Sequence, residues 1–257
     1  MENPHALPPT FVQRLRQARH IAVLTGAGIS AESGIPTFRE AQTGLWARYN
    51  PQELASPQAL RRQPGLVWAW YTWRRGLVEQ AQPNPGHLAL AEMERLAPRF
   101  TLITQNVDGL QQRAGSQNVI ELHGNIMRTV CAAHRHKVTQ WEPAPEGEAP
   151  RCPQCGSVLR PDVVFFGENL PAEALQRAME AAQACDVMLV VGTSGVVYPA
   201  ASLPGMAKDA GALVAEINPQ PTPLSSLADI VLRQPAGKAL PLLVQAMKRN
   251  FFAQDGF

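Results

Sequence analysis

The sequence has no long hydrophobic run. No stretch approaches the roughly 18 apolar residues that a helix needs to cross a bilayer, and segment 1–20 has no apolar core of the length found in signal peptides. We therefore expect no membrane partner, no secretory leader and a cytoplasmic location.

A strong charge of either sign is missing as well. Lys and Arg total 23 and Asp and Glu total 21, which gives a net charge of +2 at pH 7. Because nucleic-acid binders usually carry a marked excess of basic residues, we expect no nucleic acid among the partners.

Cysteine is scarce, with four residues in a chain of 257. Three of them lie close to histidines in the sequence, which is typical of metal ligands in a reducing compartment and not of a disulfide framework. The remaining composition, 45% hydrophobic and 17% charged, is ordinary for a globular protein. This length is sufficient for one large domain with an insertion.

A short uncharged run, Ile21–Leu24, leads into a glycine turn. Gly26, Gly28 and Ala31 fit the G-x-G-x-x-G/A spacing, in which glycines make a tight turn and let the backbone approach a pyrophosphate at a helix N-terminus. The pattern, with Ala27 inside it, predicts a buried strand followed by a phosphate-binding turn. A tight strand-to-loop turn without a ligand is the alternative.

The residues after this turn depart from an ordinary dinucleotide dehydrogenase. Gly34 and Pro36 break helices, so the first helix should be short. Phe38 and Arg39 follow, and they would offer an aromatic lid and a guanidinium near the phosphates. No acidic residue that would contact a ribose ends a strand about 20 positions after the glycines. Asn218, at the end of a later strand, is the candidate for that role.

Apolar runs alternate with amphipathic segments over the rest of the chain. This alternation predicts an α/β fold, a Rossmann-like parallel sheet with helices on both faces. Strands are expected at 21–24, 100–104, 119–122, 163–166, 187–191, 213–217 and 230–232, and helices at 10–19, 87–96, 172–184, 200–210 and a closing segment that ends near 250.

Polar residues follow several of these strands. The carboxyl ends of parallel strands meet at one edge of a sheet, where open α/β folds bind their ligands, so we expect these side chains to gather in one crevice. A histidine at the same edge as an amide and a carboxylate is a catalytic candidate. The residues are Gln105, Asn106, Asp108, His123, Gly192, Thr193, Ser194 and Asn218.

Two segments interrupt the alternation. Residues 40–83 are rich in helix formers and tryptophan, and we expect a helical insertion. Segment 127–160 contains Cys131-x-x-His134 and Cys152-x-x-Cys155, separated by about 17 residues, which matches a zinc-ribbon module with a closed structural site. His136 is close enough to compete with His134, and loss of the metal is a further alternative.

Taken together, these motifs resemble the sirtuin family, in particular the bacterial desuccinylase and demalonylase type. The resemblance covers about residues 20–245 and implies an NAD-consuming protein-lysine deacylase. Its Rossmann-like NAD-binding domain would comprise 1–39, 84–126 and 161–257, and its small domain the helical insertion 40–83 with the zinc module 127–160. The motifs are Gly26-Ala27-Gly28-Ile29-Ser30, Thr104-Gln105-Asn106-Val107-Asp108, His123-Gly124, the two ligand pairs, Phe166-Gly167-Glu168, Gly192-Thr193-Ser194 and Glu216-Ile217-Asn218.

The resemblance also implies roles for individual positions. His123 would be the general base, because an imidazole with a pKa of about 6.5 accepts a proton at neutral pH, and Asn106 would assist at the nicotinamide end. Zinc would be held by Cys131, His134, Cys152 and Cys155. NAD, the co-substrate, would be bound by Gly26, Ala27, Gly28, Phe38, Arg39, Gln105, Asn106, Asp108, Gly192, Thr193, Ser194 and Asn218.

The acyl-lysine protein is expected to bind as an extended strand between Phe166-Gly167 and the loop at Val196. Ala55, Tyr71 and Arg74 resemble the residues that select succinyl and malonyl groups; otherwise they are a core tyrosine and a solvated arginine on a helix. The rival functions are a non-enzymatic NAD or ADP-ribose binding module and a mono-ADP-ribosyl transferase.

Overall fold

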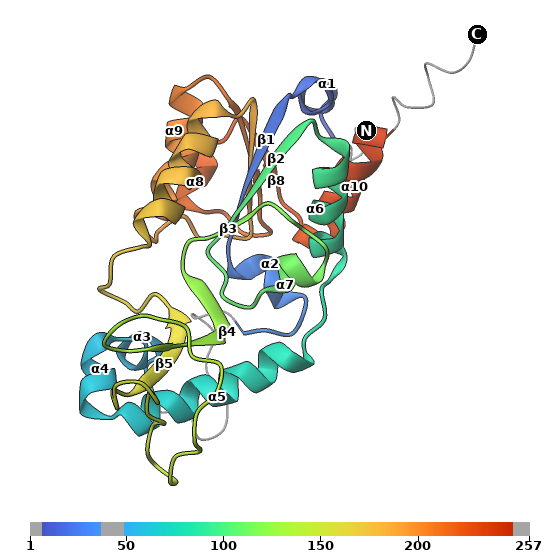
Figure 1. Cartoon of the computed structure of the whole chain (residues 1–257). Coiled ribbons are helices and arrows are strands. Elements are labelled where there is room, and N and C mark those ends of the chain that lie inside the picture. Colours follow the sequence, from blue (N-terminus) through green and yellow to red (C-terminus); the bar gives the residue numbers. More distant parts are fainter. Residues whose placement is uncertain (1–6, 37–48, 249–257) are drawn as a thin grey trace.

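A six-stranded parallel sheet with the order β3-β2-β1-β6-β7-β8 forms the centre of the computed structural model, which describes residues 7–36 and 49–248 (Figure 1). The chain starts in the middle of the sheet, builds outward on one side and then returns to build the other, as in doubly wound dinucleotide-binding folds. Neighbouring β1 and β6 therefore mark the topological switch point. The strands are β1 (His20–Thr25), β2 (Arg99–Thr104), β3 (Val119–Glu121), β6 (Val187–Val191), β7 (Leu213–Ile217) and β8 (Ile230–Leu232).

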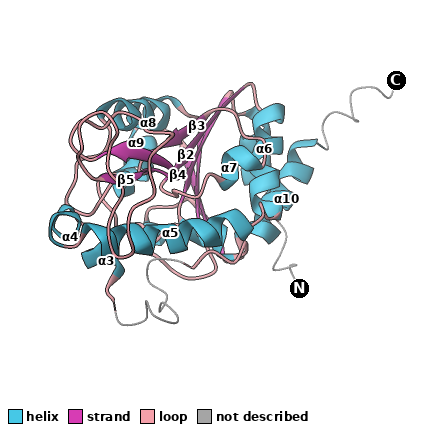
Figure 2. Cartoon of the chain, turned by 60° about the horizontal axis from the view of Figure 1, so that its bottom comes forward, coloured by secondary structure: helices cyan, strands magenta, loops and turns pink. Residues whose placement is uncertain are grey.

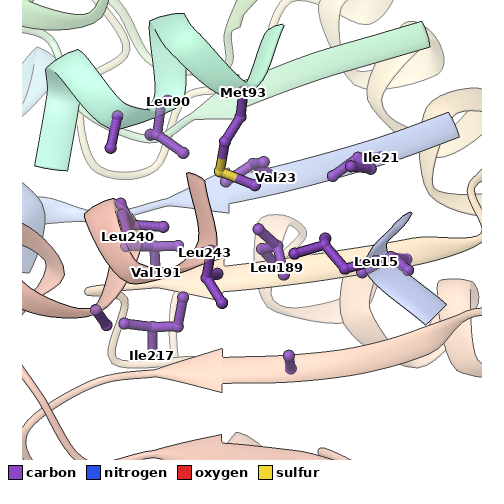
Figure 3. Packing of buried hydrophobic residues seen from close by; sticks show 14 of the residues in the cluster. Leu15, Ile21, Val23, Leu90, Met93, Leu189, Val191, Ile217, Leu240 and Leu243 are labelled. Atoms are coloured by element: carbon purple, nitrogen blue, oxygen red, sulfur yellow. The ribbon is translucent and has the colours of Figure 1, made fainter. Parts of the chain in front are cut away.

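Helices cover both faces of this sheet, as predicted. All residues of β1 are buried; Ile21 and Val23 pack on one face, and Ala22 and Leu24 on the other. Figure 3 shows the first core, in which side chains of α1, α6 and α10 interlock with those of β1, β6 and β7. The first face carries α1 (Pro9–Gln17), α6 (Pro85–Leu96) and α10 (Ala236–Lys248), and the second carries α8 (Ala172–Ala184) and α9 (Leu203–Asp209).

The helix after the glycine turn is short, also as predicted. It is α2 (Ala27–Ala31), and the chain leaves it through Gly34, whose φ of +79° lies in the left-handed region that glycine adopts without steric penalty.

Within residues 7–36 and 49–248, none of the helices combines the length and the apolar character that a membrane span requires.

The strand predicted at 163–166 is wrong. The chain instead forms β5 (Leu159–Val163), which pairs antiparallel with β4 (Gly124–Cys131) in a separate two-stranded sheet. The run 163–166 is apolar because Phe165 is buried in a cluster with Tyr71, not because it crosses the large sheet. At the start of β4, a side chain on Gly124 would place its Cβ 2.1 Å from the carbonyl oxygen of Asp162, so only glycine permits this pairing.

The helical insertion packs against this small sheet. Its helices are α3 (Pro51–Leu54), α4 (Pro57–Arg62) and α5 (Pro64–Gln80), and Figure 2 shows α5 running across the molecule from α4 toward α6. Residues of α3 and α5 share one hydrophobic cluster with Ile126 of β4 and Val163 of β5. The two segments thus share one hydrophobic core, and β4 and β5 extend into stretches that the prediction gave to the large domain.

Candidate functional site

Two glycine turns meet at the switch point between β1 and β6. The backbone N–H of Gly28 donates to the carbonyl oxygen of Gly192 at 2.8 Å, and a Cβ on Gly28 would lie 2.7 Å from that oxygen. Gly192 itself has a φ of +58°. A side chain at Gly28 or Gly192 would therefore clash with the facing turn, which leaves bare backbone at these two positions beside the N-terminus of α2, beginning at Ala27, at the edge of the sheet.

Polar side chains from three strand ends converge beside these turns. The amide nitrogen of Gln105, after β2, donates to Oγ1 of Thr193, after β6, at 2.9 Å. The amide nitrogen of Asn218, after β7, donates to the carbonyl oxygen of Thr193 at 3.0 Å. Ser194 follows in the same loop and is half-buried. The structure thus brings together residues that the sequence predicted as NAD contacts.

A second group of buried polar residues lies next to the glycine turn. Nδ2 of Asn106 donates to the carbonyl oxygen of Gly26 at 3.1 Å and to Oγ of Ser30 at 3.0 Å. Ser30 in turn donates to Oδ2 of Asp108 at 2.8 Å. Burial raises the pKa of Asp108, while the N–H of Leu110 and the hydroxyl of Ser30 lower it. Ser30 had no predicted role, because only the folded chain brings α2 against the residues that follow β2.

His123 lies where β3 ends and β4 begins. Its Nδ1 is 2.8 Å from the carbonyl oxygen of Gln105, and since a carbonyl only accepts, Nδ1 carries the proton and Nε2 carries the lone pair. Burial lowers the pKa of His123, and the bond to Gln105 partly opposes that. The imidazole is therefore neutral at pH 7 with Nε2 available as a base.

The residues predicted to select the acyl group are buried together. The backbone N–H of Phe166 donates to the carbonyl oxygen of Ala55 at 2.8 Å, and the Tyr71 ring stacks on Phe165 with centroids 5.7 Å apart. Arg74 is only 7% exposed, so the alternative of a solvated arginine is wrong. Burial lowers the pKa of the Arg74 guanidinium, and electrostatic interaction with Tyr71 and Asp108 partly opposes this, so Arg74 lies near enough to Asp108 to interact with its carboxylate.

The predicted peptide-binding positions are on the surface. Phe166 is 41% exposed and Val196 is 48% exposed, while Gly167 adopts a φ of +87°. Exposed apolar side chains beside irregular backbone are suited to contact a second chain. Phe38 and Arg39 lie outside the described residues.

Three thiols meet in the small module. Among the described residues, Cys131, Cys152 and Cys155 form a group whose sulfur atoms lie within 4.8 Å of one another, a donor set that fits structural zinc. The prediction placed His134 in this group, but His134 is exposed and lies outside it. Nε2 of His136 lies 3.4 Å from Sγ of Cys152 instead.

The fold and the site together define a class. A doubly wound parallel sheet, a glycine turn at its switch point and a small module with clustered thiols are the features of a Rossmann-like dinucleotide-binding protein with a zinc ribbon. The model of the Sir2 family matches residues 26–199. The chain belongs to the Sir2 family.

Individual relatives agree with this assignment. A protein of Ralstonia nicotianae named NAD-dependent protein deacylase is 56% identical over 234 residues, which cover 90% of this chain and 93% of the relative. A crystal structure of a Sir2 homologue in complex with NAD is 46% identical, with a TM-score of 0.89 and 97% of each chain covered. A structure of Sir2 with a p53 peptide and NAD is 33% identical, with a TM-score of 0.82, and covers 96% of this chain and 100% of that one.

Proposed function

We propose that this protein is an NAD-dependent protein-lysine deacylase that prefers acidic acyl groups, succinyl or malonyl. The relatives named as deacylases and the NAD complex of a similar structure support the first part. The buried Arg74 on the same helix as Tyr71 is the observation that carries the second.

The polar strand ends suit NAD. The amides of Gln105 and Asn218, held on Thr193, present groups that pair with ribose hydroxyls, and the bare glycine turn at the start of α2 suits the pyrophosphate. NAD, when bound, supplies a ribose carbon from which nicotinamide leaves. Asn106 uses its Nδ2 hydrogens on Gly26 and Ser30, so its amide oxygen is the atom it presents to a ribose hydroxyl or water.

His123 is the base in this proposal. A ribose hydroxyl must lose a proton before it attacks the acyl carbon, and Nε2 of His123 can take that proton because Nδ1 is committed to Gln105. Its lowered pKa keeps the imidazole neutral at physiological pH. Zinc, when bound, would supply a structural cross-link in the small module and no chemical step.

A carboxylate on the acyl group would match the charge of Arg74. A buried carboxylate is costly unless it is paired and hydrogen-bonded, and a guanidinium is a suitable partner. Tyr71 and Arg74 lie three residues apart on α5 and hence on one face of that helix, so their polar ends can reach the same carboxylate. Ala55 is buried, and its carbonyl oxygen accepts a hydrogen bond from the N–H of Phe166. In this proposal its small side chain leaves room for a longer acyl chain.

Kinetics on one peptide with three different acyl groups test the proposal. Truncating one partner of a buried charge pair typically costs about 2–5 kcal/mol, so Arg74→Met should lower kcat/KM for the succinyl peptide by roughly 30-fold or more. The acetyl peptide has no carboxylate to lose and should change by less than about 3-fold. Tyr71→Phe should follow the same direction with a smaller effect.

Arg61→Met, which removes an exposed arginine of the neighbouring α4, is the matched control and should leave all three activities unchanged. If Arg74→Met lost succinyl and acetyl activity equally, Arg74 would be a structural residue. If the parent strongly preferred acetyl-lysine, the acidic-acyl proposal would fail while the deacylase proposal stood.

A further inference from the structure

The thiol module is built from two turns with the same backbone hydrogen bonds. In the second, the N–H of Gly156 donates to the carbonyl of Cys152 at 2.9 Å, and the N–H of Cys152 donates to the carbonyl of Ser157 at 2.7 Å. In the first, the N–H of Arg135 donates to the carbonyl of Cys131 at 2.9 Å, and the N–H of Cys131 donates to the carbonyl of His136 at 3.0 Å. Arg135 and Gly156 both have positive φ, +59° and +71°.

This equivalence pairs each position of one turn with a position of the other. His134 occupies the place of the thiol Cys155, and His136 occupies the place of Ser157. Backbone equivalence alone would therefore make His134 the fourth ligand. The side chains do otherwise. Neither histidine belongs to the group of three thiols, but His134 is exposed, whereas His136 is half-buried with its Nε2 3.4 Å from Sγ of Cys152.

The hairpin around the first turn explains the difference. Val130 forms an antiparallel bridge with Lys137, and the N–H of Val138 donates to the carbonyl of Thr129 at 2.9 Å, so Cys131 and His136 stand directly opposite each other. Residues directly opposite in an antiparallel pair project to the same face of the ladder. The sulfur of Cys131 and the ring of His136 are therefore directed to one side, whereas His134 sits in the turn beyond them.

Two distances in the module match those between the ligands of a tetrahedral zinc ion. With Zn–S bonds of about 2.3 Å and Zn–N bonds of about 2.0–2.1 Å, neighbouring sulfurs lie about 3.8 Å apart and a sulfur and a nitrogen about 3.6 Å apart. The observed separations are 3.5 Å between the sulfurs of Cys131 and Cys155 and 3.4 Å between Sγ of Cys152 and Nε2 of His136. The three sulfur atoms lie within 4.8 Å of one another, but His136 is not part of that group, so its ring has to turn from Cys152 toward Cys131 and Cys155 before the four donors close a tetrahedron.

We propose that His136, and not His134, is the fourth zinc ligand of this chain, through Nε2. The ligands are then Cys131-x4-His136 and Cys152-x-x-Cys155. In the first turn the second ligand thus lies two residues further from the first ligand than it does in the other turn. An imidazole side chain is longer than the thiol of a cysteine. A histidine can therefore reach the metal from position 136, whereas in the other turn the cysteine stands at the position equivalent to 134.

Metal affinity of the full-length protein tests the assignment without any assay of activity. Zinc content is measured after purification without added zinc, and affinity is measured by competition with a chromogenic chelator. The parent and His134→Ala should each hold about one zinc per chain with equal affinity. His136→Ala should bind zinc more than about 100-fold more weakly, beyond the roughly 10–100-fold cost of losing a residue that only supports a ligand.

His136→Cys keeps the test decisive should the alanine variant fail to fold. It should again hold one metal ion, and its Co²⁺ form should show thiolate charge-transfer absorption about one third stronger than that of the parent, since four thiolates replace three. Loss of the metal in His134→Ala with retention in His136→Ala would overturn the proposal. Unchanged affinity in both alanine variants, an unchanged Co²⁺ spectrum in His136→Cys, or a folded parent without zinc would do so as well.

Discussion

Glu216 is buried in β7 and holds the loop that follows Asn218, so its removal should weaken both the fold and NAD binding. The side chain is 1% exposed. Its carboxylate accepts hydrogen bonds from the hydroxyls of Thr222 and Ser225, the latter at 2.6 Å, and from Arg233 at 2.9 Å. Thr222 caps the short helix η3 (Pro223–Ser226), so the carboxylate fixes the whole return of the chain from β7.

Glu216→Gln keeps the size of the side chain and removes its charge. An amide has one oxygen, so three donors now face one acceptor and an N–H group, and at least one bond to a charged acceptor is lost. Such a bond contributes about 1.5–3 kcal/mol. The ion pair with Arg233 adds little, because the arginine side chain is 36% exposed. A loss of about 2 kcal/mol corresponds to a fall in Tm of roughly 4–8 °C for a chain of this size.

Thermal melts and NAD kinetics measure the two consequences. We expect the stated fall in Tm and a KM for NAD raised several-fold, with kcat at saturating NAD nearly unchanged, because Asn218 is displaced while His123 is not. Glu146→Gln, on an exposed loop, is the control for removing a carboxylate. A Glu216→Gln protein that melts within about 1 °C of the parent would refute the reasoning.

Further predictions concern the base, the buried histidines and the metal. His123→Ala should bind NAD like the parent in calorimetry while turnover falls about 100-fold or more; equal turnover would remove His123 from its role. Because burial lowers the pKa of His123, kcat/KM should fall with decreasing pH only below about 6.5, and an inflection above pH 7 would contradict this. Burial lowers the pKa of His87 to about 4, and its buried Nε2 has no partner among the described residues, so the unfolded chain binds the extra proton more readily. Stability should therefore fall as the pH drops from about 6.5 to 4, by as much as about 3 kcal/mol, and denaturant titrations of the non-titrating His87→Gln should show a flatter pH dependence. Removing zinc with a chelator should change the tryptophan emission, since Trp141 of the module contacts Trp68 of α5 edge-to-face at 5.9 Å, while an unchanged spectrum after complete metal loss would argue against a structural ion.

The large sheet could be predicted because its signals are local. Uncharged runs such as 187–191 and 213–217 end in glycine or polar residues, and the structure places β6 and β7 at those bounds. The polar strand ends could also be predicted, since the carboxyl ends of parallel strands share one edge. Nothing more than periodicity and turn chemistry was needed for this part of the site.

The failures arise from contacts between residues far apart in sequence. The run 163–166 was predicted as a strand, yet Phe165 within it packs its ring against Tyr71 and against the guanidinium of Arg160, which lies 3.6 Å from the ring centroid. Spacing offered His134 as a zinc ligand with His136 as a competitor, and only the folded chain shows that His134 is exposed while Nε2 of His136 lies 3.4 Å from Sγ of Cys152. The role of Ser30 depends on the packing of α2 against the end of β2, which spacing cannot reveal.

The central claim is that this protein consumes NAD to remove acyl groups from lysine, and product analysis tests it most directly. The protein is incubated with NAD and with succinyl, malonyl and acetyl versions of one lysine peptide, and nicotinamide, the free peptide and O-acyl-ADP-ribose are quantified by mass spectrometry. We expect the three products in equal amounts, formed faster from the succinyl and malonyl peptides than from the acetyl peptide. NAD binding without these products for every acyl group, or ADP-ribose attached to protein in their place, would contradict the claim.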